Sequence, residues 1–143
     1  MSKQTARGYI ASGPFKGNRA PQHIQNQIVR LYCETQNLEY VLSRAEYSMG
    51  KNTDSQLWAA LKEGFKHIVF FSLWQLPLDE KEREEVYKHC WTNNITLHFA
   101  TERISTNTDI SSYSDLELLI KTHLLMPSDR NHGNHLETLG KLI

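Results

Sequence analysis

Several features that would place a chain in a familiar class are missing here. The 143 residues hold only two cysteines and four prolines, and 16 Lys+Arg balance 16 Asp+Glu. Cys33 and Cys90 lie in helical patterns and no signal-peptide pattern is present, which predicts buried thiols in a reducing cytoplasm. No apolar run approaches the ~18 residues of a membrane span. These two patterns predict a cytoplasmic protein without a membrane partner, and the balanced charge predicts no nucleic acid as partner.

Cofactor and metal motifs are also missing. Gly8, Gly13 and Gly17 do not form G-x-G-x-x-G, and no G-x-x-x-x-G-K-[ST] phosphate loop is present. There is no C-x-x-C, and no H-x-x-x-H lies on a helical pattern. His132 and His135 are three residues apart in a polar stretch without nearby cysteines or paired acids. We therefore expect no cofactor and no metal.

What is present is an alternation of short apolar strands and amphipathic helices. The expected strands are 8–12, 40–42, 67–71 and 95–100, and the expected helices are 21–36, 54–65, 77–91 and 114–124. Residues 43–53 and 101–113 are expected loops. The continuous apolar run of 67–71 is typical of a strand buried on both faces. The order predicts an α/β three-layer sandwich, Rossmann-like or resolvase-like, with a mainly parallel sheet of four to five strands.

The chain is expected to form one domain over residues 1–127, with Pro127 ending the last helix. Residues 128–143 form a separate tail. Its end carries a short apolar stripe at Leu136, Leu139, Leu142 and Ile143. Such a stripe is typical of a terminus packed on its own domain, and a subunit contact is the alternative. We expect a homo-oligomer, since domains of this kind commonly dimerise through edge strands or helices.

Candidate site residues follow from this architecture. The carboxyl ends of parallel strands lie at one edge of the sheet, where ligands bind. The side chains expected to converge there are those of Ser12, Arg44, Glu46, Tyr47, Ser72, Gln75 and Glu102. The first turn of the first helix adds Arg19, Gln22, His23 and Asn26. A polar cluster of this kind suits an anionic or hydroxyl-rich ligand.

Three of these residues carry the proposed chemistry. A helix N-terminus disfavours the imidazolium, so His23 is a candidate base near pH 7. Glu46 is its candidate partner in proton exchange, and Tyr47 would act as an acid or stack on a ring. The other residues would bind hydroxyls or phosphate. The alternative is that these polar side chains are solvated or support the backbone.

The order of elements resembles the catalytic domain of serine recombinases. That family has Y-x-R-x-S in its first strand and a motif like K-L-D-R-L-x-R after its third. Aligning Tyr9 with the first motif puts the arginine at Ala11 and the serine at Gly13. In the second motif, Gln75 and Leu78 replace the arginines. Phosphoryl transfer would then lack its main electrostatic support.

A second resemblance, over about residues 8–125, is to the bacterial family named for sporadic carbohydrate clusters. Its matching segments are Gly8-Tyr9-Ile10, Pro21-Gln22-His23, Glu46-Tyr47, Gln75-Leu76-Pro77 and Leu97-His98-Phe99-Ala100. The resemblance implies a role in surface-carbohydrate biosynthesis. We expect a cofactor-independent isomerase, epimerase or lyase acting on a sugar phosphate or nucleotide sugar. A non-catalytic sugar-nucleotide-binding or pathway-partner protein, and a degenerate recombinase-like DNA binder, are the alternatives.

Overall fold

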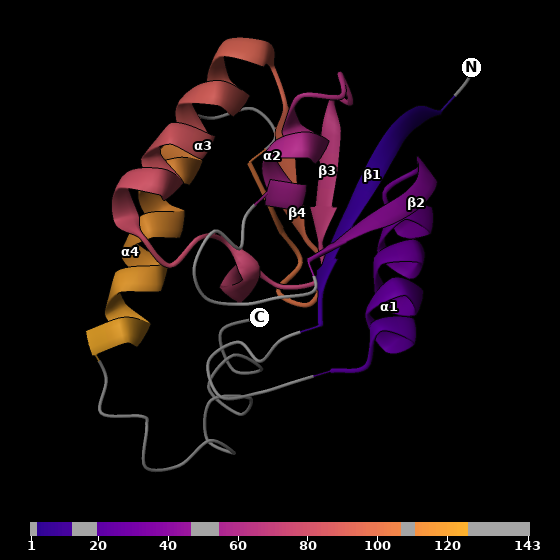
Figure 1. Ribbon diagram of the computed structural model, residues 1–143, viewed down its shortest axis with the longest axis horizontal. Helices are drawn as coiled ribbons and strands as arrows, with labels where there is room; N and C mark the ends of the chain where they lie inside the picture. The colour runs from indigo at the N-terminus through magenta and orange to yellow at the C-terminus, as the bar shows by residue number, and fades with distance from the viewer. Residues whose placement is uncertain (1–2, 13–19, 47–54, 107–110, 126–143) are drawn as a thin grey trace.

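The structure is a computed structural model that describes residues 3–12, 20–46, 55–106 and 111–125 (Figure 1). Within them lie five strands and four α-helices. The strands are β1 Gln4–Ala11, β2 Leu38–Glu46, β3 His67–Phe70, β4 Thr96–Phe99 and β5 Ile104–Ser105. The helices are α1 Gln22–Thr35, α2 Ser55–Leu61, α3 Glu80–Asn93 and α4 Ser111–Leu125, with a 3₁₀ turn, η1, at Leu73–Gln75. The expected α/β class is confirmed.

The sheet is mixed, which corrects the expected mainly parallel sheet. Its strand order is β2-β1-β3-β4-β5, with β5 antiparallel to β4 and the other neighbours parallel. A tight turn causes the reversal. The amide of Arg103 donates to the carbonyl of Phe99 at 2.8 Å, and Arg103 has a positive φ of 58°. This turn sends the chain back along β4 and places β5 inside a segment expected to be a loop.

Helices cover the sheet on both sides, as Figure 1 shows, with α1 on one face and α2, α3 and α4 on the other. Successive strand side chains point to opposite faces. In β1, Ala6 and Ile10 therefore pack with Val29 and Cys33 of α1, whereas Tyr9 packs into the larger core on the opposite face. The cysteines are confirmed as free and buried.

The two neighbouring strands β1 and β2 are longer than the sequence predicted. Their register shifts between Arg7, opposite Val41, and Gly8, opposite Ser43. Leu42 is therefore an extra residue in β2, which makes a β-bulge. Gly8 fits because it lacks a side chain: a Cβ there would lie 2.2 Å from Ser43 Oγ. The side chains of Ser43 and Tyr40 thus occupy the space that a side chain at this position would need.

The start of α3 agrees with its expected cap. Asp79 Oδ2 accepts a hydrogen bond from the amide of Glu82 at 3.1 Å. The helix ends at Asn94, which takes the left-handed conformation with φ 56°. No helix among the described residues has the length and hydrophobicity needed to cross a bilayer. Pro127 and the tail 128–143 lie outside the described residues, so the expected domain boundary stays a prediction.

Candidate functional site

The strand order reverses between β1 and β3, because β2 lies beyond β1 on one side and β4 lies beyond β3 on the other. In open α/β sheets, ligands bind outside the carboxyl ends of the strands at such a switch point. Here these ends are Ala11 and Ser12 after β1, and Ser72 with η1 after β3. Their surroundings are the candidate site.

Gln25 ties α1 to the end of β1. Its Nε2 donates to the carbonyls of Ala11 and Ala20, both at 2.7 Å, and its Oε1 accepts from the Ala11 amide at 3.1 Å. The side chain is fully buried. Three backbone bonds therefore fix which end of the amide is oxygen. Gln25 was absent from our candidate residues, although it is the polar residue on the buried stripe of α1.

Gln75 of η1 completes a contact across the switch point. Its Nε2 donates to Gln25 Oε1 at 2.9 Å, and the side chain is 2% exposed. Because Gln25 is fixed by the backbone, the orientation of Gln75 follows from it. Gln75 Oε1 is buried and has no hydrogen-bond partner among the described residues. The site therefore holds a hydrogen-bond acceptor, Gln75 Oε1, that has a fixed orientation and no partner among the described residues.

Glu102 and Ser72 form a second buried contact beside it. Ser72 Oγ donates to Glu102 Oε2 at 2.8 Å, and the amide of Leu73 donates to Oε1 at 2.9 Å. Burial raises the pKa of Glu102, and these two hydrogen bonds oppose that rise in part. Both residues were expected at this edge of the sheet and meet there. The carboxylate holds the first turn of η1, since it binds that turn's backbone.

Glu46, at the end of β2, also binds the backbone at the start of a helix. Its Oε1 accepts from Tyr9 Oη at 3.0 Å and from the amide of Gln56 at 3.1 Å. The carboxylate thus binds the first turn of α2 and is 4% exposed. Ser12 lies close by, because its Oγ donates to the Glu46 carbonyl at 3.2 Å. Tyr9, which sequence reasoning used only as an alignment marker, is the core residue that positions this acid.

Other expected site residues do not converge. His23 is exposed on the first turn of α1. Asn26 accepts from Tyr40 Oη on the α1 face of the sheet, whereas Arg44 binds Gln56 and Glu63 on the opposite face. Ser43 and Arg44 are consecutive in β2, so their side chains diverge. Gln22 is half-buried beside His23 with no role shown, and Arg19 and Tyr47 lie outside the described residues.

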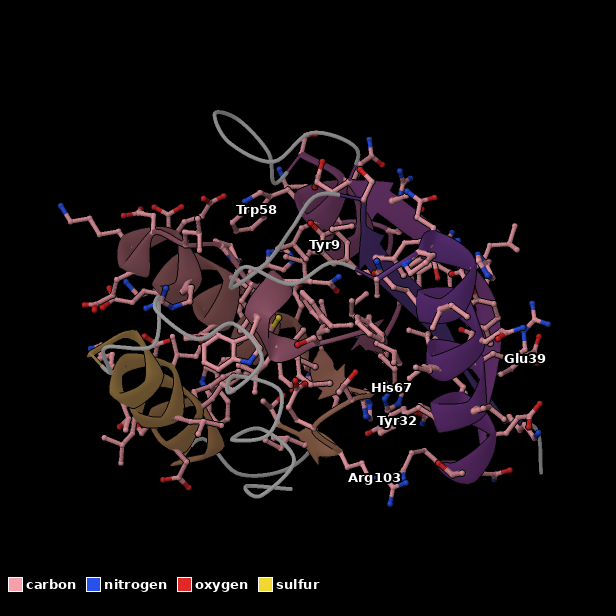
Figure 2. The ribbon with its side chains drawn as sticks, turned by 90° about the horizontal axis from the view of Figure 1, so that it is seen from below. Tyr9, Tyr32, Glu39, Trp58, His67 and Arg103 are labelled. Carbon is pink, nitrogen blue, oxygen red and sulfur yellow. The ribbon has the colours of Figure 1, made fainter. Side chains whose placement is uncertain are left out.

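A separate polar chain crosses the α1 face of the sheet. Tyr32 Oη lies 2.7 Å from His98 Nδ1, and His98 Nε2 lies 2.9 Å from His67 Nδ1. His67 Nε2 in turn contacts Gln4 Oε1. Figure 2 shows Tyr32 and His67 together between α1 and the sheet. Within the described residues, no three His, Cys, Asp or Glu side chains are grouped to hold a metal ion.

Comparison with known proteins bears on the fold. No protein-family model and no curated protein matches this chain. Among solved structures, it is similar to the N-terminal catalytic domain of the TP901-1 integrase, at 14% identity and a TM-score of 0.60, over 84% of this chain and 99% of that one. It is also similar to a resolvase family site-specific recombinase from Streptococcus pneumoniae, at 11% identity and 0.59, over 83% and 88%. The chain has a resolvase-like fold.

This finding corrects three predictions. The resemblance to recombinase domains is confirmed at the level of fold, whereas the carbohydrate-cluster family is unsupported. The prediction of a surface-carbohydrate enzyme acting on a sugar phosphate or nucleotide sugar is wrong, and so is the exclusion of nucleic acid as a partner. The error has a physical source. Balanced total charge says nothing about how charge is distributed over the surface.

Proposed function

We propose that this chain is a DNA-binding protein built on a recombinase catalytic-domain fold, and that it does not cut DNA itself. The observation that carries the proposal is the fold similarity, which spans almost the whole of an integrase catalytic domain. The named function of both similar proteins is site-specific recombination or integration, which acts on DNA. The DNA-binding alternative from the sequence is therefore the function best supported.

The end of β1 and the η1 segment support the absence of cutting. The position that the resemblance assigns to the β1 arginine is Ala11, which is buried and bound on both backbone groups by Gln25. Gln75 takes a second arginine position and donates its amide protons inside the protein. A neutral amide and a methyl group cannot stabilise a phosphoryl transition state as guanidinium groups do. Binding without cleavage follows.

The distribution of charge suggests where DNA would bind. Residues 79–85 at the start of α3 hold five acids and two bases, a composition that repels phosphate. At the carboxyl edge of the sheet, His23 and Arg103 are exposed. Phosphates bind to basic side chains and to helix N-termini such as that of α1. We therefore place the DNA at this edge, away from α3.

A variant pair tests this placement. Arg103→Glu is expected to weaken binding to a short labelled duplex by about tenfold, since a phosphate contact becomes a repulsion. Lys88→Glu makes the same charge change on the exposed surface of α3 and is expected to leave the affinity unchanged. Both are measured by fluorescence anisotropy at low salt. An equal loss in the two variants would contradict the proposed interface.

Cleavage is tested separately. Supercoiled plasmid incubated with the protein and Mg²⁺ is expected to stay supercoiled at protein concentrations that saturate binding. Ser12→Ala is the control, because Ser12 carries the hydroxyl nearest the end of β1 among the described residues. Nicking by the natural protein that disappears in Ser12→Ala would show that this chain cuts DNA, and the second half of the proposal would fail.

A further inference from the structure

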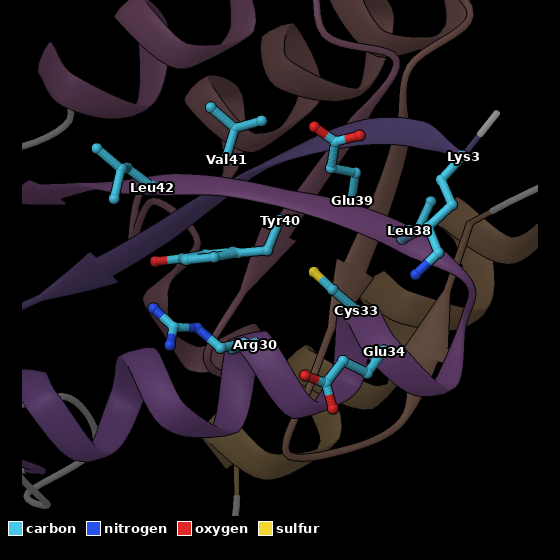
Figure 3. A pocket seen from close by; sticks show the side chains of 9 residues that line it. All are labelled: Lys3, Arg30, Cys33, Glu34, Leu38, Glu39, Tyr40, Val41 and Leu42. Carbon is cyan, nitrogen blue, oxygen red and sulfur yellow. The ribbon is translucent and has the colours of Figure 1, made fainter.

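The edge strand β2 borders a groove of about 600 Å³, whose lining does not include the His23 and Arg103 of the proposed DNA interface. Figure 3 shows its walls: Arg30 and Glu34 come from α1, and Leu38 to Leu42 come from β2. Among the described strands, β2 pairs with β1 alone, so its other edge keeps unpaired backbone groups. An open edge next to a groove is the arrangement to which an extended peptide adds as a further strand.

Only the first half of β2 is open in this way. The bulge interrupts the pairing with β1 after Val41, and the pairing resumes at Ser43 in a shifted register. Arg7 Nη1 donates to the carbonyl of Leu42 at 3.1 Å and to that of Val41 at 3.4 Å. A bulge and a charged side chain both discourage further strand pairing. The straight segment Leu38–Tyr40, which lines the groove, remains as the template.

Charge distinguishes the two ends of the groove. The guanidinium of Arg30 lies 5.3 Å from the ring centre of Tyr40, and it forms no salt bridge among the described residues. Tyr40 is itself held by hydrogen bonds to Asn26 and Ser43. Arg30 is thus held beside Tyr40, with no anionic partner in the part of the chain that the structure describes. The end at Leu38 is lined by Lys3, Glu34 and Glu39, and its net charge is negative.

We propose that β2 binds an extended segment of another protein, added antiparallel to Leu38–Tyr40, with an acidic residue at Arg30 and a basic residue two positions later. A strand antiparallel to β2 runs in the same direction as α1, from Arg30 toward Glu34. Residues two apart in a strand are ~6.8 Å apart along its axis. Arg30 and Glu34 are four residues apart in α1, which corresponds to a rise of ~6 Å. The acidic residue of the added strand would therefore face Arg30, and its basic residue would face Glu34. The acid-then-base order follows from this match.

Peptide titration tests the proposal by NMR amide shifts of isotope-labelled protein. The probe is Thr-Val-Asp-Val-Lys-Val-Thr. We expect shifts at Leu38–Leu42 and Arg30–Glu34, and about tenfold weaker binding when Asp and Lys are exchanged or when alternate backbone amides are N-methylated. In a variant carrying both Arg30→Glu and Glu34→Arg, the exchanged peptide should bind better. Lys88→Glu is the matched surface control and should keep the original preference.

Four results would overturn the proposal. They are an absence of shifts at millimolar peptide, equal binding of the N-methylated peptide, an unchanged preference in the doubly substituted variant, and shifts confined to other strands. Without peptide, shifts at β2 that depend on protein concentration would assign the edge to a second copy of the chain. Shifts at β2 on adding duplex DNA would assign it to nucleic acid. The DNA-binding proposal is unaffected by failure here, since its variants lie at a different edge.

Discussion

At the scale of single residues, buried polar side chains in this protein serve mainly to join segments. Gln25 is the clearest case, because it satisfies three backbone groups and also accepts from Gln75. Glu46 and Glu102 likewise bind backbone amides at the starts of α2 and η1. These side chains hold the carboxyl edge of the sheet in shape, and His23 and Arg103 are exposed there.

Replacing Gln25 should therefore cost more than its size suggests. Gln25→Leu keeps most of the volume but leaves buried backbone groups without partners, and the expected loss is ~2–3 kcal/mol of unfolding free energy. Gln27→Leu changes the same residue type at an exposed position of α1 and should stay within ~0.5 kcal/mol of the natural protein. Urea denaturation measures both. Equal, small effects would show that the Gln25 hydrogen bonds contribute little.

The polar chain of Tyr32, His98, His67 and Gln4 makes the stability of the protein depend on pH. Burial, reinforced by the neighbouring His67, lowers the pKa of His98 to about 3, and burial also lowers the pKa of His67. Burial and neighbouring Cys33 raise the pKa of Tyr32 to about 12, so its hydroxyl remains a donor to His98. With both histidines neutral, each nitrogen can have one role in a chain from Tyr32 to Gln4. Burial makes an added proton on either ring unfavourable.

The sign of the effect follows. Unfolded histidines take up a proton near pH 6.5, whereas folded His98 does not, so stability is lost as pH falls below about 6.5, by at most ~1.4 kcal/mol per pH unit for this residue. His98→Gln does not titrate and should reduce this loss between about pH 7 and pH 5. The urea midpoints of the natural protein and of His98→Gln, measured at both pH values, give this loss of stability. An unchanged loss in His98→Gln would contradict the assignment of the effect to His98.

At the scale of elements, the β1–β2 pair depends on one glycine. Gly8→Ala would bring a methyl group to 2.2 Å from Ser43 Oγ and 3.0 Å from Tyr40, and the expected cost is ~1–3 kcal/mol. Ser43→Gly removes the closest contact and should recover most of that loss in the double variant. Gly64→Ala, strained by its φ of 101°, should not be rescued by Ser43→Gly. Thermal unfolding of these variants measures the loss of stability and its recovery.

The contact between α3 and α4 depends on a buried ion pair. Arg83 is 3% exposed and donates to both oxygens of Glu117, at 2.8 and 3.0 Å. Glu117→Gln leaves the guanidinium buried without its counter-charge, and the expected loss is about 3 kcal/mol. Glu80→Gln breaks the exposed pair with Lys121 between the same helices and should cost under about 1 kcal/mol. Similar losses of unfolding free energy for the two variants in a urea titration would mean that the contact between α3 and α4 does not depend on the Arg83–Glu117 pair.

The elements that pack on both faces were predictable from sequence, and those at the edges were not. The expected strands 67–71 and 95–100 match β3 and β4 closely, because their continuous apolar runs reflect burial. β2 extends to Glu46 through residues expected to form a loop, since an edge strand carries polar side chains. β5 is two residues long and has no sequence pattern of its own.

The candidate site was predicted in location but not in detail. Ser72 and Glu102 meet as expected because parallel strand ends share one edge. The error in α1 concerns which face of the helix is buried. Helical spacing predicts a buried stripe through Ile24, Ile28, Leu31, Tyr32 and Thr35. Of these, Tyr32 is buried, but Ile24 is 37% and Leu31 59% exposed, and the buried residues of α1 are Gln25, Val29, Tyr32 and Cys33. A rule that places apolar residues inside cannot find a buried glutamine whose partners are backbone groups distant in sequence.

At the scale of the whole molecule, a recombinase catalytic-domain fold is combined with neutral residues at the positions where the resemblance expects arginines. The fold brings a helix N-terminus and two exposed basic side chains to the carboxyl edge of the sheet. Gln25, Gln75 and Ala11 are buried at this edge and are neutral. Such an edge can attract phosphate without stabilising its transfer, which is the central claim.

The salt dependence of DNA affinity tests that claim most directly. Anisotropy titrations of a short duplex over a series of salt concentrations should give a logarithmic affinity that falls linearly with the logarithm of salt, with a slope of about −0.9 for each phosphate contacted. Arg103→Glu should make that slope shallower by about one contact. Micromolar binding with this behaviour would support the account. No binding at low salt, or affinity that does not change with salt, would contradict it.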